Sequence, residues 1–90
     1  MKYQVIWRLS ALNELAALWA NADSTLREAI TAAAANIDAT LRRSPDQVGE
    51  SRPHNQRIGF VKPLGFTFRV RPADQRVTVI RVWMTERGKA

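Results

Sequence analysis

The sequence contains no cysteine and only one histidine, His54. Without cysteine, the chain has no disulfides and no thiolate ligands for a metal. Histidine, aspartate and glutamate do not cluster at the spacing of metal ligands, so we expect neither a metal nor a cofactor. The four glycines are scattered at positions 49, 59, 65 and 88, which excludes a glycine-rich phosphate loop.

Long apolar runs are also missing. No stretch of about 18 apolar residues occurs, so no transmembrane helix is predicted. The chain opens on strand-like residues from Tyr3, not on a basic segment followed by an apolar one and a cleavage site. We therefore expect no signal peptide, no membrane association and a cytoplasmic location.

Positive charge is present in excess and is unevenly placed. The 90 residues, which we take as one domain, carry a net charge of +6. Residues 1–41 hold three basic and four acidic residues, whereas residues 42–90 hold eleven basic residues, nine of them arginine, and four acidic ones. Arginine suits phosphate and carboxylate groups better than lysine does. This half of the chain favours a nucleic acid or an acidic protein as partner, the alternative being a merely soluble basic surface.

Three β-rich runs in the second half predict an antiparallel meander. They span residues 57–62, 65–71 and 76–83 and are separated by proline and glycine. The middle run alternates clearly: Phe66, Phe68 and Val70 share one face. Thr67, Arg69 and Arg71 share the other face. One face of this sheet needs an apolar cover, and the other meets solvent or an anionic partner.

The first half supplies that cover. We expect a strand at residues 2–8 and two helices at residues 10–21 and 24–43. Ser10 is the expected N-cap of the first helix, and Thr25 with Glu28 forms a capping box on the second.

The remaining segments are a polar loop at residues 44–56 and a short polar tail at residues 84–90. The predicted fold is a two-layer α+β domain over residues 1–90: an N-terminal strand, an αα-hairpin and a three-stranded antiparallel meander. We expect Trp7 and Trp19 in its core.

Two features of the polar loop are candidates for chemistry. Glu50 could act as a general base while Arg52 holds a phosphate, or the two side chains could simply pair and close a turn. His54 is either a solvated loop residue or a catalytic one.

The arginines of the sheet form a stronger constellation. If Ile80 and Val82 point to the helices, Arg81 and Trp83 point the other way. The open side of the sheet would then offer charge for phosphates and a ring for base stacking. Its expected members are Arg57, Arg69, Arg71, Arg81 and Trp83. The alternative is a solvated surface whose charges prevent edge pairing.

The order of elements and their residues together resemble the RelE/ParE superfamily of bacterial toxins. The resemblance covers nearly the whole chain: Tyr3-Gln4-Val5-Ile6-Trp7, the helical hairpin, the loop with Gly49, and a meander ending in Val77-Thr78-Val79-Ile80-Arg81-Val82. It implies a toxin of a type II toxin–antitoxin pair. The implied partner is an antitoxin whose acidic segment masks the basic face.

The resemblance also implies a target. RelE-like members cut mRNA on the ribosome without a metal, whereas ParE-like members inhibit DNA gyrase. Cleavage here would rest on Glu50, Arg52, His54, Arg57 and Arg81, and RNA binding on Arg52, Arg57, Arg69, Arg71, Arg81 and Trp83.

The chain departs from the nuclease pattern at two places. Gly65 stands where RelE-like nucleases usually have an arginine, and no His or Tyr follows Trp83. The readings are therefore a toxin that binds the ribosome or mRNA, a gyrase inhibitor, or a toxin-fold protein that only pairs with an antitoxin.

Overall fold

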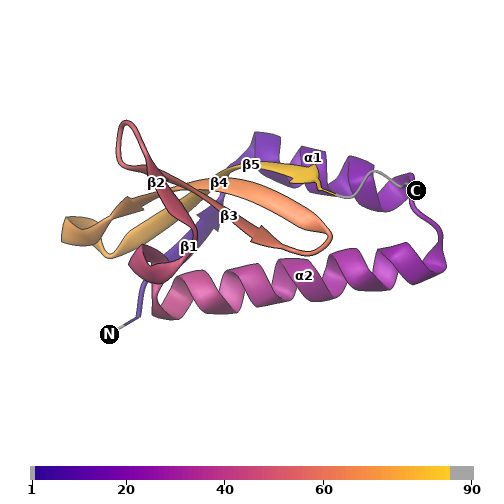
Figure 1. Cartoon of the computed structure of the whole chain (residues 1–90), viewed down its shortest axis with the longest axis horizontal. Coiled ribbons are helices and arrows are strands. Elements are labelled where there is room, and N and C mark those ends of the chain that lie inside the picture. Colours follow the sequence, from indigo (N-terminus) through magenta and orange to yellow (C-terminus); the bar gives the residue numbers. More distant parts are fainter. Residues whose placement is uncertain (1, 86–90) are drawn as a thin grey trace.

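The computed structural model describes residues 2–85, which form a sheet covered by two helices on one face (Figure 1). Two short 3-10 turns, Pro45–Gln47 and Pro72–Asp74, interrupt the second half. The helices and strands are β1 (Gln4–Trp7), α1 (Leu9–Ala20), α2 (Ser24–Arg43), β2 (Glu50–Arg52), β3 (Gln56–Val61), β4 (Leu64–Arg71) and β5 (Arg76–Met84). The predicted α+β class with two layers is confirmed.

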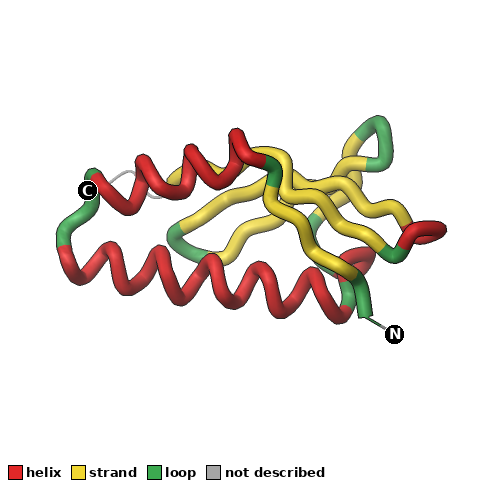
Figure 2. The backbone as a smooth tube through the Cα atoms, turned by 180° about the vertical axis from the view of Figure 1, so that it is seen from behind, coloured by secondary structure: helices red, strands yellow, loops and turns green. Residues whose placement is uncertain are grey.

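The sheet has the strand order β1-β5-β4-β3-β2. β1 pairs in parallel with β5, and the other neighbours pair antiparallel. The two helices run antiparallel and are joined by a short loop at one end of the molecule (Figure 2). After β1 the chain passes through both helices and enters the sheet again at the opposite edge, as β2. The following strands then cross the sheet one by one until β5 lies beside β1.

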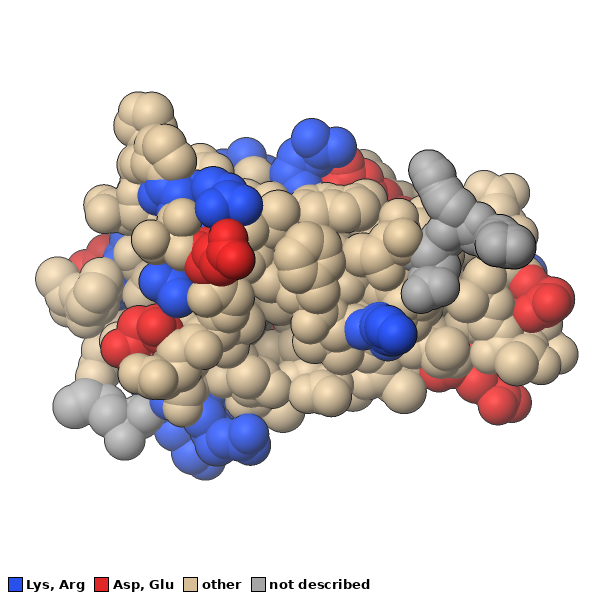
Figure 3. All heavy atoms as spheres, in the orientation of Figure 1, with Lys and Arg blue, Asp and Glu red and all other residues tan. Residues whose placement is uncertain are grey.

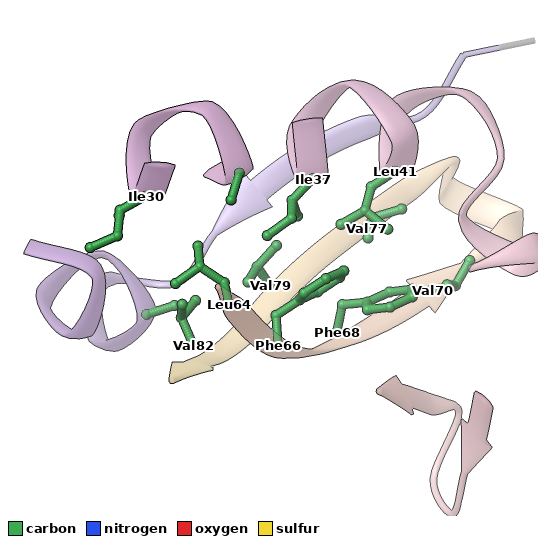
Figure 4. Close-up of a cluster of buried hydrophobic side chains, with 12 residues drawn as sticks. Ile30, Ile37, Leu41, Leu64, Phe66, Phe68, Val70, Val77, Val79 and Val82 are labelled. Carbon is green, nitrogen blue, oxygen red and sulfur yellow. The ribbon is translucent and has the colours of Figure 1, made fainter. Parts of the chain in front are cut away.

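The core lies between the helices and the centre of the sheet (Figure 4). From the middle run, Phe66, Phe68 and Val70 are buried as the alternation predicts. One side of α2 meets them, and its buried residues are Ile30, Ala33, Ile37 and Leu41. Burying one such aliphatic or aromatic side chain contributes about 1.5–3 kcal/mol, so this stripe is the main attachment of α2.

The predicted polar loop at residues 44–56 is wrong in one respect, because it contains β2. This strand forms a hairpin with β3, so four antiparallel strands replace the predicted three. His54 and Asn55 have φ angles of 65° and 62°, the left-handed conformation that tight hairpin turns require. All three β2 residues are exposed, so the strand shows no apolar period in the sequence.

Both predicted caps differ from the structure. α1 begins at Leu9, one residue before Ser10, and Arg8 at its N-cap makes no side-chain cap hydrogen bond. The N-cap of α2 is Asp23, whose Oδ1 accepts a hydrogen bond from Leu26 N at 2.9 Å. Thr25 already lies inside the helix, so it cannot cap it.

Of the two tryptophans expected in the core, Trp7 packs against it and Trp19 does not. Trp7 is half-buried and donates from Nε1 to Asp38 Oδ1 at 3.2 Å. Trp19 is 43% exposed, and Leu12 on the same stripe of α1 is 45% exposed. α1 lies mainly against β5, with few contacts to α2, so part of its apolar stripe stays uncovered.

A β-bulge changes the predicted faces of β5. The register shifts between Thr67 and Phe68, which pair with Arg81 and Val79. Val79 and Val82 therefore enter the core, whereas the expected Ile80 is buried outside the core cluster. Met84, expected in the tail, ends β5, and residues 86–90 of that tail lie outside the described residues.

No helix in the described part of the chain is long and apolar enough to cross a membrane.

The cap assignment predicts a difference between two neighbouring substitutions. Asp23→Ala should lower the free energy of unfolding by about 1 kcal/mol, because the Leu26 amide loses its acceptor. Thr25→Ala should stay within about 0.5 kcal/mol of the parent. Urea unfolding followed by circular dichroism measures both, and an equal loss in the two variants would contradict the observed cap.

Candidate nucleic-acid interface

The face of the sheet that points away from the helices is called the open face here. Residues that pair across neighbouring strands point to the same face of the sheet. Residues in register with the core residues therefore face the helices, and the alternate residues belong to the open face. They are Glu50 and Arg52 of β2, Gln56, Ile58 and Phe60 of β3, Gly65, Thr67, Arg69 and Arg71 of β4, and Arg76, Thr78, Arg81 and Trp83 of β5. In Figure 3 most basic side chains lie over the strand-bearing part of the view, where acidic side chains lie among them, and further acidic side chains lie at the opposite end.

One end of the open face is aromatic. The rings of Phe60 and Trp83 meet edge to face, with centroids 6.3 Å apart. Gly65 lies between them in the register, and a Cβ there would stand 2.6 Å from two atoms of the Trp83 ring. The indole therefore covers the position where the family resemblance implies an arginine in nucleases. Phe60 is 62% exposed and was missed by the sequence reading, although it alternates with Ile58.

Arg81 belongs to the open face as predicted, but α1 already holds it. Its Nε donates to Glu14 Oε2 at 3.3 Å, while Oε1 of Glu14 accepts a hydrogen bond from Val82 N at 2.8 Å. β1 ends opposite Val79, so the backbone N–H of Val82, further along β5, has no partner on β1. Glu14 accepts the hydrogen bond from this N–H instead. The Arg81 side chain is 63% exposed, and such an exposed ion pair is weak enough for an anion to compete with it.

The other end of the open face is cationic. Arg69 and Arg71 alternate along β4, and Arg71 pairs directly with Arg76 of β5. Like charges directly opposite each other destabilise a sheet. Arg69 Nε is buried and has no hydrogen-bond partner among the described residues, which costs about 1–3 kcal/mol. His54 lies beside this end and lines a cavity of about 560 Å³ with Arg69 and Arg71.

Arg57 was expected on this face and lies on the opposite one. It pairs with Phe68, whose side chain is in the core. Its guanidinium donates to the backbone carbonyls of Val48 at 2.8 Å and Gly49 at 3.0 Å. Arg57 therefore anchors the turn that leads into β2, and these bonds turn it away from any ligand on the open face.

Glu50 and Arg52 pair with each other, as the alternative has it, but they do so within strand β2 and close no turn. Arg52 Nη1 lies 3.3 Å from Glu50 Oε1, so the two exposed side chains pair with each other on the edge strand. Glu50 shares a register row with Arg81, but Ile58 and Thr67 intervene. Three strand spacings separate the two by about 14 Å, which is too far for one reacting group.

The five candidate catalytic residues therefore do not converge. Within residues 2–85, no group of three or more His, Asp or Glu side chains could hold a metal ion. What the open face offers is guanidinium groups and aromatic rings at its two ends. These are groups that can contact phosphates and bases, and among residues 2–85 the candidate acid and base groups do not meet at one point of this face.

A second surface, apolar in character, lies between the helices. A groove of about 390 Å³ separates α1 from α2, and it is lined by Leu12, Leu15, Ala16, Trp19, Ile30, Thr31 and Ala34. Arg27 packs on one of the lining residues: its guanidinium carbon lies 4.3 Å from the centre of the Trp19 ring, and its Nε donates to Trp19 O. Trp19, which was expected in the core, lines this groove instead.

The close contact between Gly65 and Trp83 makes a prediction. Gly65→Ala should displace the indole, shift the Nε1–H resonance of Trp83 in NMR spectra and lower stability by about 1–3 kcal/mol. Thr67→Ala, the next position on this side of β4, is the control and should leave that resonance in place. An unchanged Trp83 signal in Gly65→Ala would show that the ring does not rest on the glycine.

Comparison with known proteins places this fold. No protein-family model and no curated protein sequence matches the chain. A chain of the RelBE2 toxin–antitoxin complex from Mycobacterium tuberculosis superimposes with a TM-score of 0.74 at 17% identity, covering 96% of this chain and 95% of that one.

Two further structures agree. A chain of the chromosomal ParDE toxin–antitoxin system of P. aeruginosa gives a TM-score of 0.74 at 17% identity, covering 93% of this chain and 97% of its own. The isolated E. coli RelE toxin gives 0.62 at 21% identity, covering 97% and 88%. These matches extend over nearly the whole chain, and the protein has the fold of the RelE and ParE toxins.

Proposed function

We propose that the chain is the toxin of a toxin–antitoxin pair and that it arrests translation by binding RNA on the ribosome through its open face. The fold it shares with RelE and ParE proteins supports the toxin role. The single observation that carries the target is the open face itself. The guanidinium groups at one end have no ion-pair partner among residues 2–85, and the aromatic pair at the other end consists of the exposed Phe60 and the partly exposed Trp83. These two features match the two chemical parts of single-stranded RNA.

Each end of the face has its own task in this proposal. Arg69, Arg71 and Arg81 contact phosphates, and they fix the position of the strand without reading its sequence. Trp83 and Phe60 stack on bases, and one base–aromatic contact of this kind is worth about 1–3 kcal/mol. Arg81 exchanges its weak pairing with Glu14 for a phosphate when RNA binds.

The action is binding and not cleavage. Glu50 is paired with Arg52 on the sheet edge, and Arg57 is held by two carbonyls on the other face. Neither can approach a phosphate bound near Arg81. A metal-independent nuclease needs a base and an acid on opposite sides of one phosphate, and the described residues do not provide this arrangement.

The lack of converging catalytic groups among the described residues also favours a second candidate, a ParE-like inhibitor of DNA gyrase. Such an inhibitor works without a catalytic set, and the comparison with the ParDE system is as close in fold as that with RelBE2. In this case the arginines of the open face contact gyrase or its DNA. The two candidates differ in which synthesis stops first.

The antitoxin is the second partner in this proposal. Its acidic segment masks the open face in the cytoplasm, and an amphipathic helix of the same antitoxin occupies the groove between α1 and α2. Leu12 and Trp19 remain exposed there, and a helix with apolar residues at three- and four-residue spacing would cover them.

The target is tested by pulse labelling after induction in bacteria. We expect protein synthesis to stop within minutes, before DNA synthesis falls. The double variant Arg69→Ala, Arg81→Ala should restore growth, because it removes two of the three guanidinium groups that contact phosphates in this proposal. The double variant Arg42→Ala, Arg43→Ala replaces two exposed arginines in the last turn of α2, so it is the charge-matched control and should stay toxic.

Two outcomes would contradict this proposal. If DNA synthesis stops first, the gyrase candidate replaces the ribosome. If the double variant is folded by circular dichroism and still fully toxic, the open face is not the active surface.

The groove is tested by co-expression with the product of the adjacent reading frame. Leu12→Glu should weaken capture of that protein roughly tenfold or more, because it places a charge in an apolar contact. Leu9→Glu is the matched control: Leu9 lies on the same helix, is 71% exposed and does not line the groove. Equal capture by both variants would show that the antitoxin helix binds elsewhere.

A further inference from the structure

The cavity at the cationic end of the open face is built from two turns that are distant in sequence. The β2–β3 turn contributes His54 and Asn55. The end of β4 and the 3-10 turn that follows it contribute Arg69, Arg71 and Asp74. Because Gln56 pairs with Arg69, the first turn lies directly beside the two arginines. This cavity, of about 560 Å³, is called the turn pocket here.

The turn pocket concentrates positive charge, and a single carboxylate, that of Asp74, is in its lining. Arg69 and Arg71 are about 6.6 Å apart along β4, and Arg76 faces Arg71 across the strand pair. None of these three arginines forms an ion pair within residues 2–85, where Arg42, Arg52 and Arg81 are the arginines that do. Asp74 lines the pocket and still lies beyond ion-pair distance of them. Folding brings these like charges together, which is unfavourable unless an anion binds.

Arg69 adds a second, independent observation. Its Nε is buried, and no acceptor in the described chain lies within hydrogen-bonding distance and geometry. Buried donors are nearly always satisfied, so one left over at the wall of a cavity indicates where a ligand atom is held. The acceptor that suits it best is an anionic oxygen, since a guanidinium binds such oxygens through two parallel N–H groups.

We propose that the turn pocket is a phosphate-binding site. Guanidinium groups approach from β4, and the Asn55 amide and the His54 imidazole approach from the opposite turn. Donors on two sides suit a tetrahedral oxyanion with three or four acceptor oxygens better than a planar carboxylate with two. The inference deepens the proposed function and rests on it only for the source of the phosphate, which is an RNA strand or free phosphate.

The position of the turn pocket limits which RNA can use the whole face. The Trp83 ring lies over Gly65. Arg69 comes four residues later on β4, which corresponds to a distance of about 13 Å. A mononucleotide therefore reaches only one end of the open face. A strand of several nucleotides can place a phosphate in the turn pocket and a base on Trp83 together.

The test is an NMR titration of the purified protein with inorganic phosphate at constant ionic strength. The Nε–Hε signal of Arg69 should shift saturably with phosphate and stay in place with chloride. Arg71→Gln should weaken phosphate binding roughly tenfold or more, because one charged donor pair is lost. Arg43→Gln removes the same charge at the far end of α2 and should bind phosphate like the parent.

A second arm identifies the source of the phosphate. Tetranucleotide RNA is titrated with and without a 5′-phosphate, and both should shift the Arg69 signal at lower concentration than inorganic phosphate does. A stronger effect of the 5′-phosphorylated RNA assigns the turn pocket to a strand end, and equal effects assign it to an internal phosphodiester. RNA binding that is no tighter than that of inorganic phosphate assigns it to the free ion.

Other outcomes overturn the inference. An Arg69 signal that does not saturate, or equal weakening by Arg43→Gln, would show only general attraction to a basic protein. Tighter binding of a glutamate-rich peptide than of any phosphate would assign the turn pocket to an acidic protein segment. The titration uses neither ribosomes nor cells, so its failure leaves the translation experiment standing, and failure of that experiment leaves the titration standing.

Discussion

The pairing of β4 with β5 is the constraint on which both halves of this structure depend. These strands lie at the centre of the sheet, between β1 on one side and β3 on the other. Their register puts Phe66 beside Val82 and Val70 beside Val77 in the core. The same register puts Arg71 beside Arg76 on the open face. A one-residue slip would exchange the two faces, burying the arginines and exposing the core. The core and the candidate interface are therefore two sides of one hydrogen-bonded ladder.

The sequence predicts best where one strand alone decides the outcome. In β4 the alternation of phenylalanine and valine with arginine is enough to assign both faces, and Arg69, Arg71 and Arg81 lie where they were expected. The two helices and the α+β class follow from apolar periods in the same way. These features depend on local spacing, which the sequence contains directly.

The predictions are wrong where the position of a side chain depends on the strand or helix that packs beside it. Arg57 has no fixed side until its pairing with Phe68 is known, and Trp19 needs a covering neighbour that α1 does not find. β2 was missed because an exposed polar edge strand has no apolar period, and the bulge at Ile80 breaks a period that looked regular. Whether the five candidate catalytic groups lie close together depends likewise on how the strands pair. Strand pairing cannot be derived from any one strand's sequence.

The contact between Gly65 and Trp83 limits which pairs of side chains positions 65 and 83 can hold. An arginine at position 65 and an indole resting on that position exclude each other, because even a Cβ there would collide with the ring. A variant of this chain that acquired an arginine at position 65 would therefore need a smaller residue at position 83 at the same time. Gly65→Arg alone would displace the ring, and removal of the ring alone would add no guanidinium. The glycine thus makes an indole packed on β4 and an arginine at position 65 two alternatives that no single substitution exchanges.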